Sequence, residues 1–189
     1  ERPGFTPSEK TVGKTFDSLF EEHKNTRIFV ATFASNVDRV QQIINTAYKF
    51  GKKVCVEGRS MVSIIETARN LECISIPDNT LIEIDQLKNY PDDQQVIITT
   101  GSQGESMAAL SRMANGMHRK ITIGAGDTVI FSSNPIPGNE KSVTKVINEL
   151  LRKGADVIFQ DAHVSGHACQ EEIKLIYTLV HPKYAIPVH

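Results

Sequence analysis

Two histidines and a serine surround a glycine in the segment His163-Val164-Ser165-Gly166-His167. The segment follows an apolar run typical of a buried strand, and alternate side chains beyond a strand end can turn toward one ligand. Imidazole binds phosphate when it is protonated, donates a proton to a leaving oxygen, or ligates a metal when it is neutral. The pattern predicts a phosphate or metal site; the alternative is a pair of loop histidines with satisfied hydrogen bonds.

A further histidine, His189, follows the apolar run at 186–188, which places it at the carboxyl end of a predicted strand. A hydrolytic zinc site needs three or more nitrogen, oxygen or sulfur ligands, and the sequence contains no H-x-H-x-D-H run. If His189 binds a metal, most of the other ligands are expected outside these residues. His23, His118 and His181 are interpreted as surface or structural residues.

Two glycine-bearing turns could bind an anion. The segment 101–105 follows an apolar strand and precedes a short helix, so it is either a loop that presents N–H groups to a phosphate or a glycine turn with Glu105 in the first helical turn. Arg59 stands between Gly58 and Ser60 and is either a bidentate phosphate clamp or a solvated residue at a helix start. Both alternatives stay open for each turn.

Several catalytic and nucleotide-binding motifs are excluded. Gly13-Lys14-Thr15 lacks the glycine that a P-loop requires five positions earlier, where Ser8 stands. Gly124-Ala125-Gly126 precedes a strand and does not open a helix, so it is not a dinucleotide fingerprint. The absence of G-x-S-x-G and H-E-x-x-H disfavours serine hydrolases and zincins.

Composition indicates an ordinary globular protein of 189 residues, which fits one domain or one lobe of a larger enzyme. With 40% hydrophobic and 23% charged residues, disordered, collagen-like and disulfide-stapled classes are excluded. The 21 basic and 22 acidic residues leave a net charge of −1, so a nucleic-acid site must be a local pocket and not a basic face.

The three cysteines are far apart and form no C-x-x-C, which favours a reducing cytosol over a disulfide framework. No apolar run approaches the ~20 residues needed to cross a bilayer, and the first residues do not form a signal sequence. We therefore expect a cytoplasmic protein with no membrane association. The chain lacks an initiator Met and stops directly after an apolar stretch, so we expect a fragment.

After a polar lead-in, apolar β-rich runs alternate with segments of helical periodicity. Strands are predicted at 28–33, 53–56, 96–100, 127–131, 155–159 and 184–188, and helices at 40–50, 61–68, 107–113, 143–151 and 173–179. Such alternation predicts an α/β fold: doubly wound and Rossmann-like, with a mostly parallel sheet and helices on both faces. Ligands bind beyond the carboxyl ends of such strands.

The polar loops at these strand ends together resemble one family. They read TFASN at 32–36, GRSM at 58–61, TTGSQGE at 99–105, SSNPIPGNE at 132–140, HVSGH at 163–167 and PVH at 187–189. This set resembles bacterial ribonuclease J, a metallo-β-lactamase-type nuclease with an inserted β-CASP domain. The resemblance covers the whole chain and implies a β-CASP domain at 1–160 and a return segment into the metallo-β-lactamase domain at 161–189.

The resemblance implies a 5′-to-3′ exoribonuclease and endoribonuclease for RNA processing and decay, with two zinc ions in the catalytic half. His189 matches the late zinc ligand, and His167 matches the histidine at the scissile phosphate, a candidate proton donor or oxyanion stabiliser. His163, Ser165 and the intervening glycine Gly166 match positions that hold phosphate. Arg59 and Ser102 match loops that face the RNA channel.

The implied partners are single-stranded RNA with a preferred 5′-monophosphate, the protein's own metallo-β-lactamase domain, and further copies or a paralogue. Two positions depart from the family pattern: Asp38 stands where a histidine is common, and the segment 159–162 is shorter than usual. The resemblance also implies that most of the zinc ligands lie outside this chain, so the isolated fragment is expected to be inactive. Two alternatives are kept: a non-catalytic scaffold subunit of a ribonuclease J complex, and a Rossmann-like nucleotide-binding module.

Overall fold

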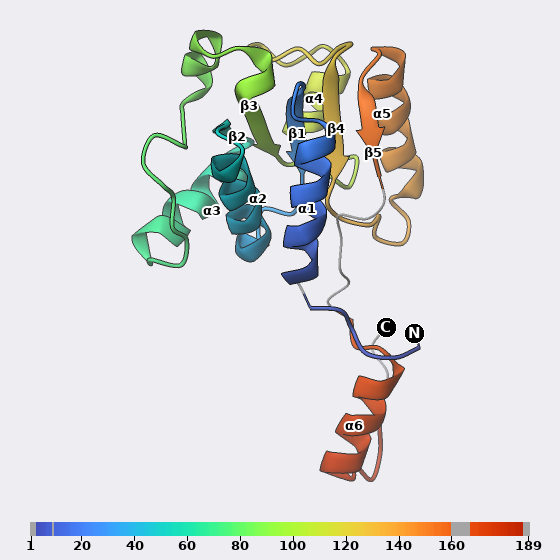
Figure 1. The fold of residues 1–189 in the computed structure, drawn as a ribbon. Helices are drawn as coiled ribbons and strands as arrows, with labels where there is room; N and C mark the ends of the chain where they lie inside the picture. Colours follow the sequence, from blue (N-terminus) through green and yellow to red (C-terminus); the bar gives the residue numbers. More distant parts are fainter. Residues whose placement is uncertain (1–2, 9, 160–166, 187–189) are drawn as a thin grey trace.

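Five parallel strands form the sheet at the centre of the molecule (Figure 1). The computed structural model describes residues 3–8, 10–159 and 167–186. The strands are β1 (Arg27–Ala31), β2 (Lys53–Glu57), β3 (Gln95–Thr99), β4 (Asp127–Phe131) and β5 (Asp156–Ile158), and their order in the sheet is β2-β3-β1-β4-β5. The predicted α/β class is confirmed, and so are five of the six predicted strands.

Helices cover both faces of the sheet, as predicted. One face carries α1 (Lys10–Glu22), α2 (Val37–Lys49) and α3 (Arg59–Asn70), and the other carries α4 (Ala109–Ala114) and α5 (Glu140–Arg152). Two short 3-10 helices, η1 (Ile84–Asn89) and η2 (Asp92–Gln94), precede β3.

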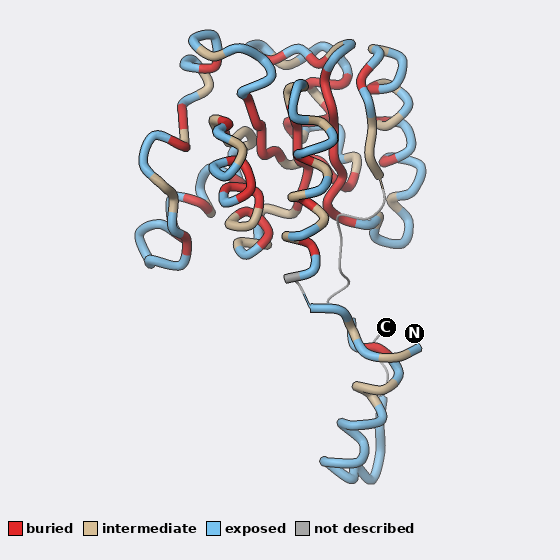
Figure 2. Tube along the Cα trace, viewed as in Figure 1, coloured by how far each residue is buried: buried red, intermediate tan, exposed pale blue. Residues whose placement is uncertain are grey.

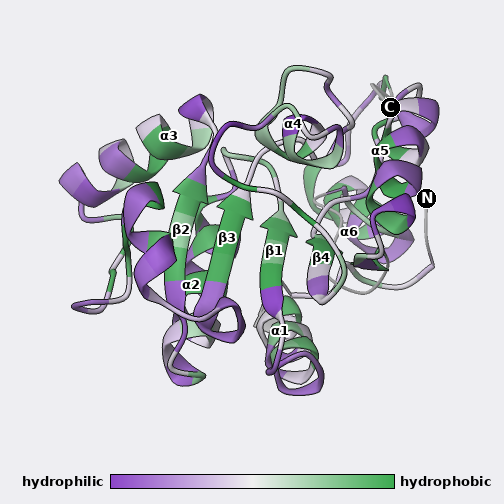
Figure 3. Cartoon of the chain, turned by 90° about the horizontal axis from the view of Figure 1, so that it is seen from above, coloured by the Kyte–Doolittle hydropathy of each residue, from purple (hydrophilic) through white to green (hydrophobic). Residues whose placement is uncertain are grey.

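Side chains of each strand belong to two separate apolar cores, one on either side of the sheet, because successive side chains of a strand point to opposite faces. In β1, Ile28 and Val30 pack with α1, α2 and α3, whereas Phe29 and Ala31 pack with α4 and α5. The central strands are consequently buried on both sides (Figure 2) and apolar along their length (Figure 3). A strand buried on both faces reads as a continuous apolar run, which explains why the sequence predicted these strands.

The first helix, α1, corrects the expectation of a polar lead-in. Its buried side chains are Val12, Phe16 and Phe20, spaced four residues apart so that they share one face of the helix. The rings of Phe16 and Phe20 meet edge to face, with their centroids 6.4 Å apart. Burial of each ring stabilises the fold by about 1.5–3 kcal/mol. With one buried apolar residue in every four, the apolar stripe of this helix is narrow. The polar residues between its members hid the helical pattern in the sequence.

The predicted strand at 184–188 is not formed over its described part, residues 184–186. Tyr184 and Ile186 are exposed there. A strand is stable only when a neighbour satisfies its backbone groups, and no described strand lies beside this segment. Residues 187–189 lie outside the described residues.

Buried charges fix the amino edge of the sheet. The Lys52 ammonium donates hydrogen bonds to the backbone carbonyls of Lys24, Thr26 and Asp93, and burial lowers the pKa of Lys52. The Arg27 guanidinium donates two bonds of 2.8 Å to the carboxylate of Asp127, which is itself buried. Both cations are bonded to carbonyl or carboxylate oxygens of the protein itself, so the charges at this edge have a structural role.

The last helix, α6 (Gln170–Val180), lies beyond the edge toward which the strand arrows point, next to the N-terminal segment (Figure 1). Thr6 joins the two: its backbone N–H lies 3.1 Å and its hydroxyl 2.5 Å from Oε2 of Glu172. No residue of α6 is buried, although Leu179 and Val180 are apolar. Among the described residues, no helix combines the length and apolar composition needed to cross a bilayer.

We expect a thiol-alkylating reagent at pH 8 to modify Cys73 and to spare Cys55 in the folded protein. Cys73 is exposed, whereas burial of Cys55, together with the negative charges of Glu57 and Glu83, raises the pKa of its thiol to about 12. At pH 8 about one Cys55 side chain in ten thousand is then the reactive thiolate. Mass spectrometry after timed labelling tests this, with the denatured chain as control. Equal labelling rates for the two residues would contradict it.

The contact between Thr6 and Glu172 should depend on pH. Hydrogen bonds from the Thr6 hydroxyl and the Cys169 backbone N–H hold the pKa of Glu172 below its ordinary value of 4.5. A lowered folded-state pKa means that the contact is stabilised above pH 4.5 and is lost as the pH falls through the folded-state value. At neutral pH, Glu172→Gln should therefore speed hydrogen exchange of the Thr6 amide.

The matched control is Glu171→Gln, because Glu171 pairs with Lys174 across the helix surface and not with Thr6. Exchange should be measured as a protection factor, so that the intrinsic pH dependence of exchange cancels. The interpretation fails if wild-type protection of Thr6 does not fall at any pH between 7 and the onset of acid unfolding.

Candidate functional site

The loops after β1, β2, β3 and β4 meet at one edge of the sheet, because parallel strands all end on the same side. From β1 the chain continues to α2 on one face, whereas from β3 and β4 it continues to α4 and α5 on the other. Ligands of open α/β sheets bind where neighbouring strands diverge in this way. Six polar side chains at this carboxyl edge are buried: Thr32, Thr99, Ser102, Gln103, Ser132 and Ser133.

A fully buried arginine, Arg39 of α2, ties that helix to the end of β4. Its Nη1 donates to the backbone carbonyl of Ser132 at 2.9 Å and lies 2.5 Å from the Ser132 hydroxyl. The side chain of Asn36 accepts from the Arg39 backbone N–H at 3.0 Å and caps the helix. Arg39 was not among the residues predicted for a site. Its position four residues before Ile43, on the apolar face of the helix, is the signal that could have found it.

Gln103 connects the loop after β3 to the loop after β4. Its Nε2 donates to the carbonyl of Asn134 at 2.9 Å, and its Oε1 accepts from the backbone N–H of Ile136 at 2.7 Å. The side chain is 4% exposed. This residue was also missed, because nothing in the sequence distinguishes a buried loop glutamine from a solvated one.

Two glycines let neighbouring loops approach closely. A Cβ on Gly58 would lie 2.6 Å from the hydroxyl oxygen of Thr100, and a Cβ on Gly104 would lie 2.4 Å from the carbonyl carbon of Ser142 in α5. Both glycines also have positive φ. The loops after β2 and β3 and the start of α5 are therefore packed at backbone contact distance, which only glycine permits.

The structure favours the glycine turn over the phosphate loop for 101–105. The Gln103 backbone N–H points to a carboxylate oxygen of Glu105, at 3.2 Å, and the Gly104 N–H bonds to the Gly101 carbonyl at 3.1 Å. Those two N–H groups are used inside the turn, and α4 begins only at Ala109. Ser102 is buried within this turn. Its role toward RNA stays a prediction.

Arg59 is the first residue of α3 and is exposed at the end of β2. That position suits either of its alternatives, a phosphate clamp or a solvated helix start. Asp38, the departure from the family pattern, is exposed in the first turn of α2.

His167 is exposed and belongs to the segment that leads into α6, where its carbonyl oxygen lies 3.0 Å from the Thr6 hydroxyl oxygen. The other predicted residues of that motif, His163, Ser165 and Gly166, lie outside the described residues, and so does His189. The described residues thus bring the loops of Arg59 and Ser102 together and place His167 on the separate segment beside Thr6.

The remaining histidines are structural, as interpreted from the sequence. The buried His118 ring lies with Nε2 3.2 Å from a carboxylate oxygen of Glu57, and its Nδ1 accepts from the Ile121 backbone N–H at 3.1 Å. Because Nδ1 is the acceptor, the proton of a neutral ring is on Nε2 and faces Glu57. His23 packs near Asp156 at the amino edge.

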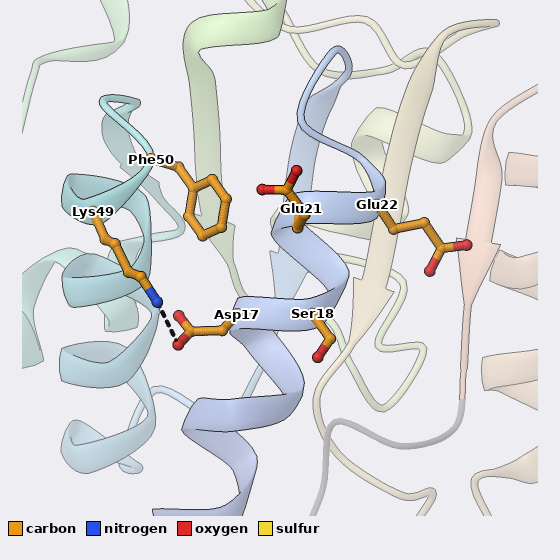
Figure 4. A pocket seen from close by; sticks show the side chains of 6 residues that line it. All are labelled: Asp17, Ser18, Glu21, Glu22, Lys49 and Phe50. Atoms are coloured by element: carbon orange, nitrogen blue, oxygen red, sulfur yellow. Dashed lines mark hydrogen bonds and ion pairs between the residues drawn. The ribbon is translucent and has the colours of Figure 1, made fainter.

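The part of the chain that the structure describes contains no metal site. No group of three or more His, Cys, Asp or Glu side chains there could hold a metal ion, so the described residues do not fit the implied zinc pair. A shallow hollow lies between α1 and the end of α2 (Figure 4). Its lining includes the ion pair of Lys49 with Asp17 and none of the predicted site residues.

Comparison with protein families gives one match, to the ribonuclease J β-CASP domain over residues 25–150. Three curated relatives align with the whole chain. They are a ribonuclease J of Synechocystis (49% identical, 30% of that protein covered), ribonuclease J2 of Bacillus subtilis (46%, 34% covered) and a ribonuclease J of Helicobacter pylori (47%, 28% covered). The chain thus spans about a third of the length of these relatives.

A solved structure supports the fold alone. A protein of unknown function from Enterococcus faecalis superposes with a TM-score of 0.64 and 17% sequence identity, covering 93% of this chain and 38% of that one.

We expect Gly104→Ala to lower the free energy of unfolding by about 2–4 kcal/mol, because a methyl group at this position overlaps the backbone of α5 and the positive φ adds strain. The control is Gly138→Ala, where φ is also positive but nothing lies within 4 Å of the added Cβ. That change should cost about 1–2 kcal/mol. Urea unfolding of both variants makes the comparison, and equal losses would disprove the close packing of Gly104 on α5.

Proposed function

Because this chain belongs to the ribonuclease J β-CASP family, we propose that it is the RNA-binding β-CASP part of a zinc-dependent ribonuclease J. The match of the whole chain to curated ribonuclease J relatives, at 49% identity for the Synechocystis protein, carries this proposal. The chain spans about a third of those relatives, so the 5′-to-3′ exonuclease and endonuclease activities are proposed for the full-length protein. The isolated chain is expected to be inactive.

We propose that residues 1–160 form the β-CASP domain and that residues 161–189 return into a metallo-β-lactamase domain. The family match at 25–150 falls within the first range. The bonds between Thr6 and Glu172 hold residues near the start of the proposed domain beside the proposed return segment. The exposed apolar residues of α6, among them Leu179, suit a helix that packs on the rest of the polypeptide.

In the proposed complex, single-stranded RNA runs along the carboxyl edge. Arg59 is exposed and can reach a phosphate, whereas Ser102 is buried and would act by supporting its loop. His163, Ser165 and Gly166 are proposed to hold the phosphate. His167 is proposed at the scissile phosphate, where an imidazole donates a proton to the leaving oxygen or offsets charge on the phosphate oxygens.

We also propose that two zinc ions supply the catalytic metal chemistry in the full-length protein. His189 is the proposed ligand from this chain, and the remaining ligands would come from the rest of the polypeptide. A cytoplasmic location, a preference for 5′-monophosphorylated ends, and assembly with further copies or a paralogue complete the proposal.

In the full-length protein, we expect His167→Ala to slow zinc-dependent degradation of 5′-monophosphorylated RNA by about a hundredfold or more, the scale of general acid or oxyanion groups. The control is His181→Asn, because His181 ends α6 in the left-handed conformation that asparagine also adopts. That variant should keep wild-type activity.

Three results would change the proposal. Activity unchanged by His167→Ala would keep the nuclease and remove His167 from its mechanism. An inert wild-type protein with an intact metal centre would favour a non-catalytic scaffold subunit. Saturable nucleotide binding without competition by RNA would favour a nucleotide-binding module.

A further inference from the structure

The side-chain amide of Gln103 forms two hydrogen bonds with the backbone of the loop after β4, one as donor and one as acceptor, as a residue of a neighbouring strand would. It donates to the carbonyl of Asn134 and accepts from the N–H of Ile136, the two backbone groups that flank Pro135. The donor and acceptor ends of an amide differ, so a single orientation of the side chain satisfies both bonds. Neither glutamate, which lacks the donor, nor methionine, which lacks both groups, can replace this pairing.

The loop after β4 depends on this external partner. Residues 134–137 read Asn-Pro-Ile-Pro, and the two prolines have no N–H to donate. The Asn139 side chain also points to Oε1 of Gln103, at 3.4 Å, and gives no cap to α5. With Gly104 packed on Ser142, the turn after β3 and the loop after β4 form one body at the carboxyl edge.

We propose that Gln103 is a positioning residue that holds residues 133–139 as a fixed wall of the RNA-binding surface and thereby sets the affinity for RNA. The proposal rests on the proposed function. Ile136, whose N–H is held by Gln103, exposes 51% of its surface at this edge. Gln103 itself is buried, so it would act on RNA through the loop that it holds. Its loss should therefore weaken RNA binding more than it slows the chemical step.

A second buried glutamine provides the matched control. Gln95 begins the same strand, β3, at the opposite edge of the sheet, and its Nε2 donates to the carbonyls of Leu87 and Tyr90. Gln95→Met removes buried hydrogen bonds comparable to those removed by Gln103→Met. Both variants should lose thermal stability to a similar extent, so stability alone cannot explain a difference in RNA binding.

Hydrogen exchange of the full-length protein tests the loop directly. Because Pro135 and Pro137 have no amide hydrogen, the segment 134–137 reports only the N–H groups of Asn134 and Ile136. Gln103→Met should speed exchange of the Ile136 amide by roughly tenfold or more, whereas Gln95→Met should leave it unchanged. Unchanged exchange in Gln103→Met would overturn the proposal.

RNA affinity provides the second measurement, with a 5′-monophosphorylated single-stranded oligonucleotide and the full-length protein. Gln103→Met should raise Kd and KM by roughly tenfold or more while kcat falls less than about threefold. Gln95→Met should leave Kd, KM and kcat unchanged. If Gln103→Met does not fold, Gln103→Glu replaces it, since it keeps the acceptor for Ile136 and loses only the donor.

These measurements distinguish failure of the positioning role from failure of the proposed function. If the wild-type protein degrades RNA but the Gln103 and Gln95 variants bind it equally well, the positioning role is wrong and the proposed function stands. If the wild-type protein neither binds nor degrades RNA, both fail.

Discussion

Parallel strands bring all their carboxyl ends to one edge of the sheet, and the backbone groups that end there still need hydrogen-bond partners. In this protein much of that edge is closed off from water, so buried side chains supply the partners. Arg39 reaches the end of β4 from α2, and Gln103 reaches the loop after β4 from the turn after β3. The loops at this edge are therefore held from beneath by buried side chains.

The two edges of the sheet use different chemistry for the same task. At the amino edge, the buried carboxylate of Asp127 pairs with the partly buried Arg27, and the buried Lys52 ammonium donates to backbone carbonyls. At the carboxyl edge most of the buried groups are neutral hydroxyls and one amide, and the cation at the end of β2, Arg59, is left on the surface. The one buried cation of this edge, Arg39, is bonded to Ser132 of the fold, which leaves Arg59 as the cation that solvent can reach.

These structural roles explain which parts of the fold and of the candidate site could be predicted from the sequence. Strands such as β1 and β4 are buried on both faces and read as apolar runs, so the sheet and its class followed from the sequence. Helix α1 was missed because Val12, Phe16 and Phe20 are a sparse stripe. Gln103 escaped notice for a different reason: residue type does not reveal whether a polar side chain is buried, and its partners lie more than thirty positions away. The histidine motif at 163–167 was assigned by resemblance, and of its residues the described part includes only His167.

The bonds from Thr6 to Glu172 also have a mechanical meaning. They join the segment before α1 to the helix that follows β5, so the chain on either side of the sheet is fastened together. Tension applied across these two segments loads the bonds between them first, and the strands of the sheet carry none of it until those bonds break. A sheet attached in this way can be pulled and turned by whatever its flanking segments are joined to while its own hydrogen-bond ladder stays unloaded.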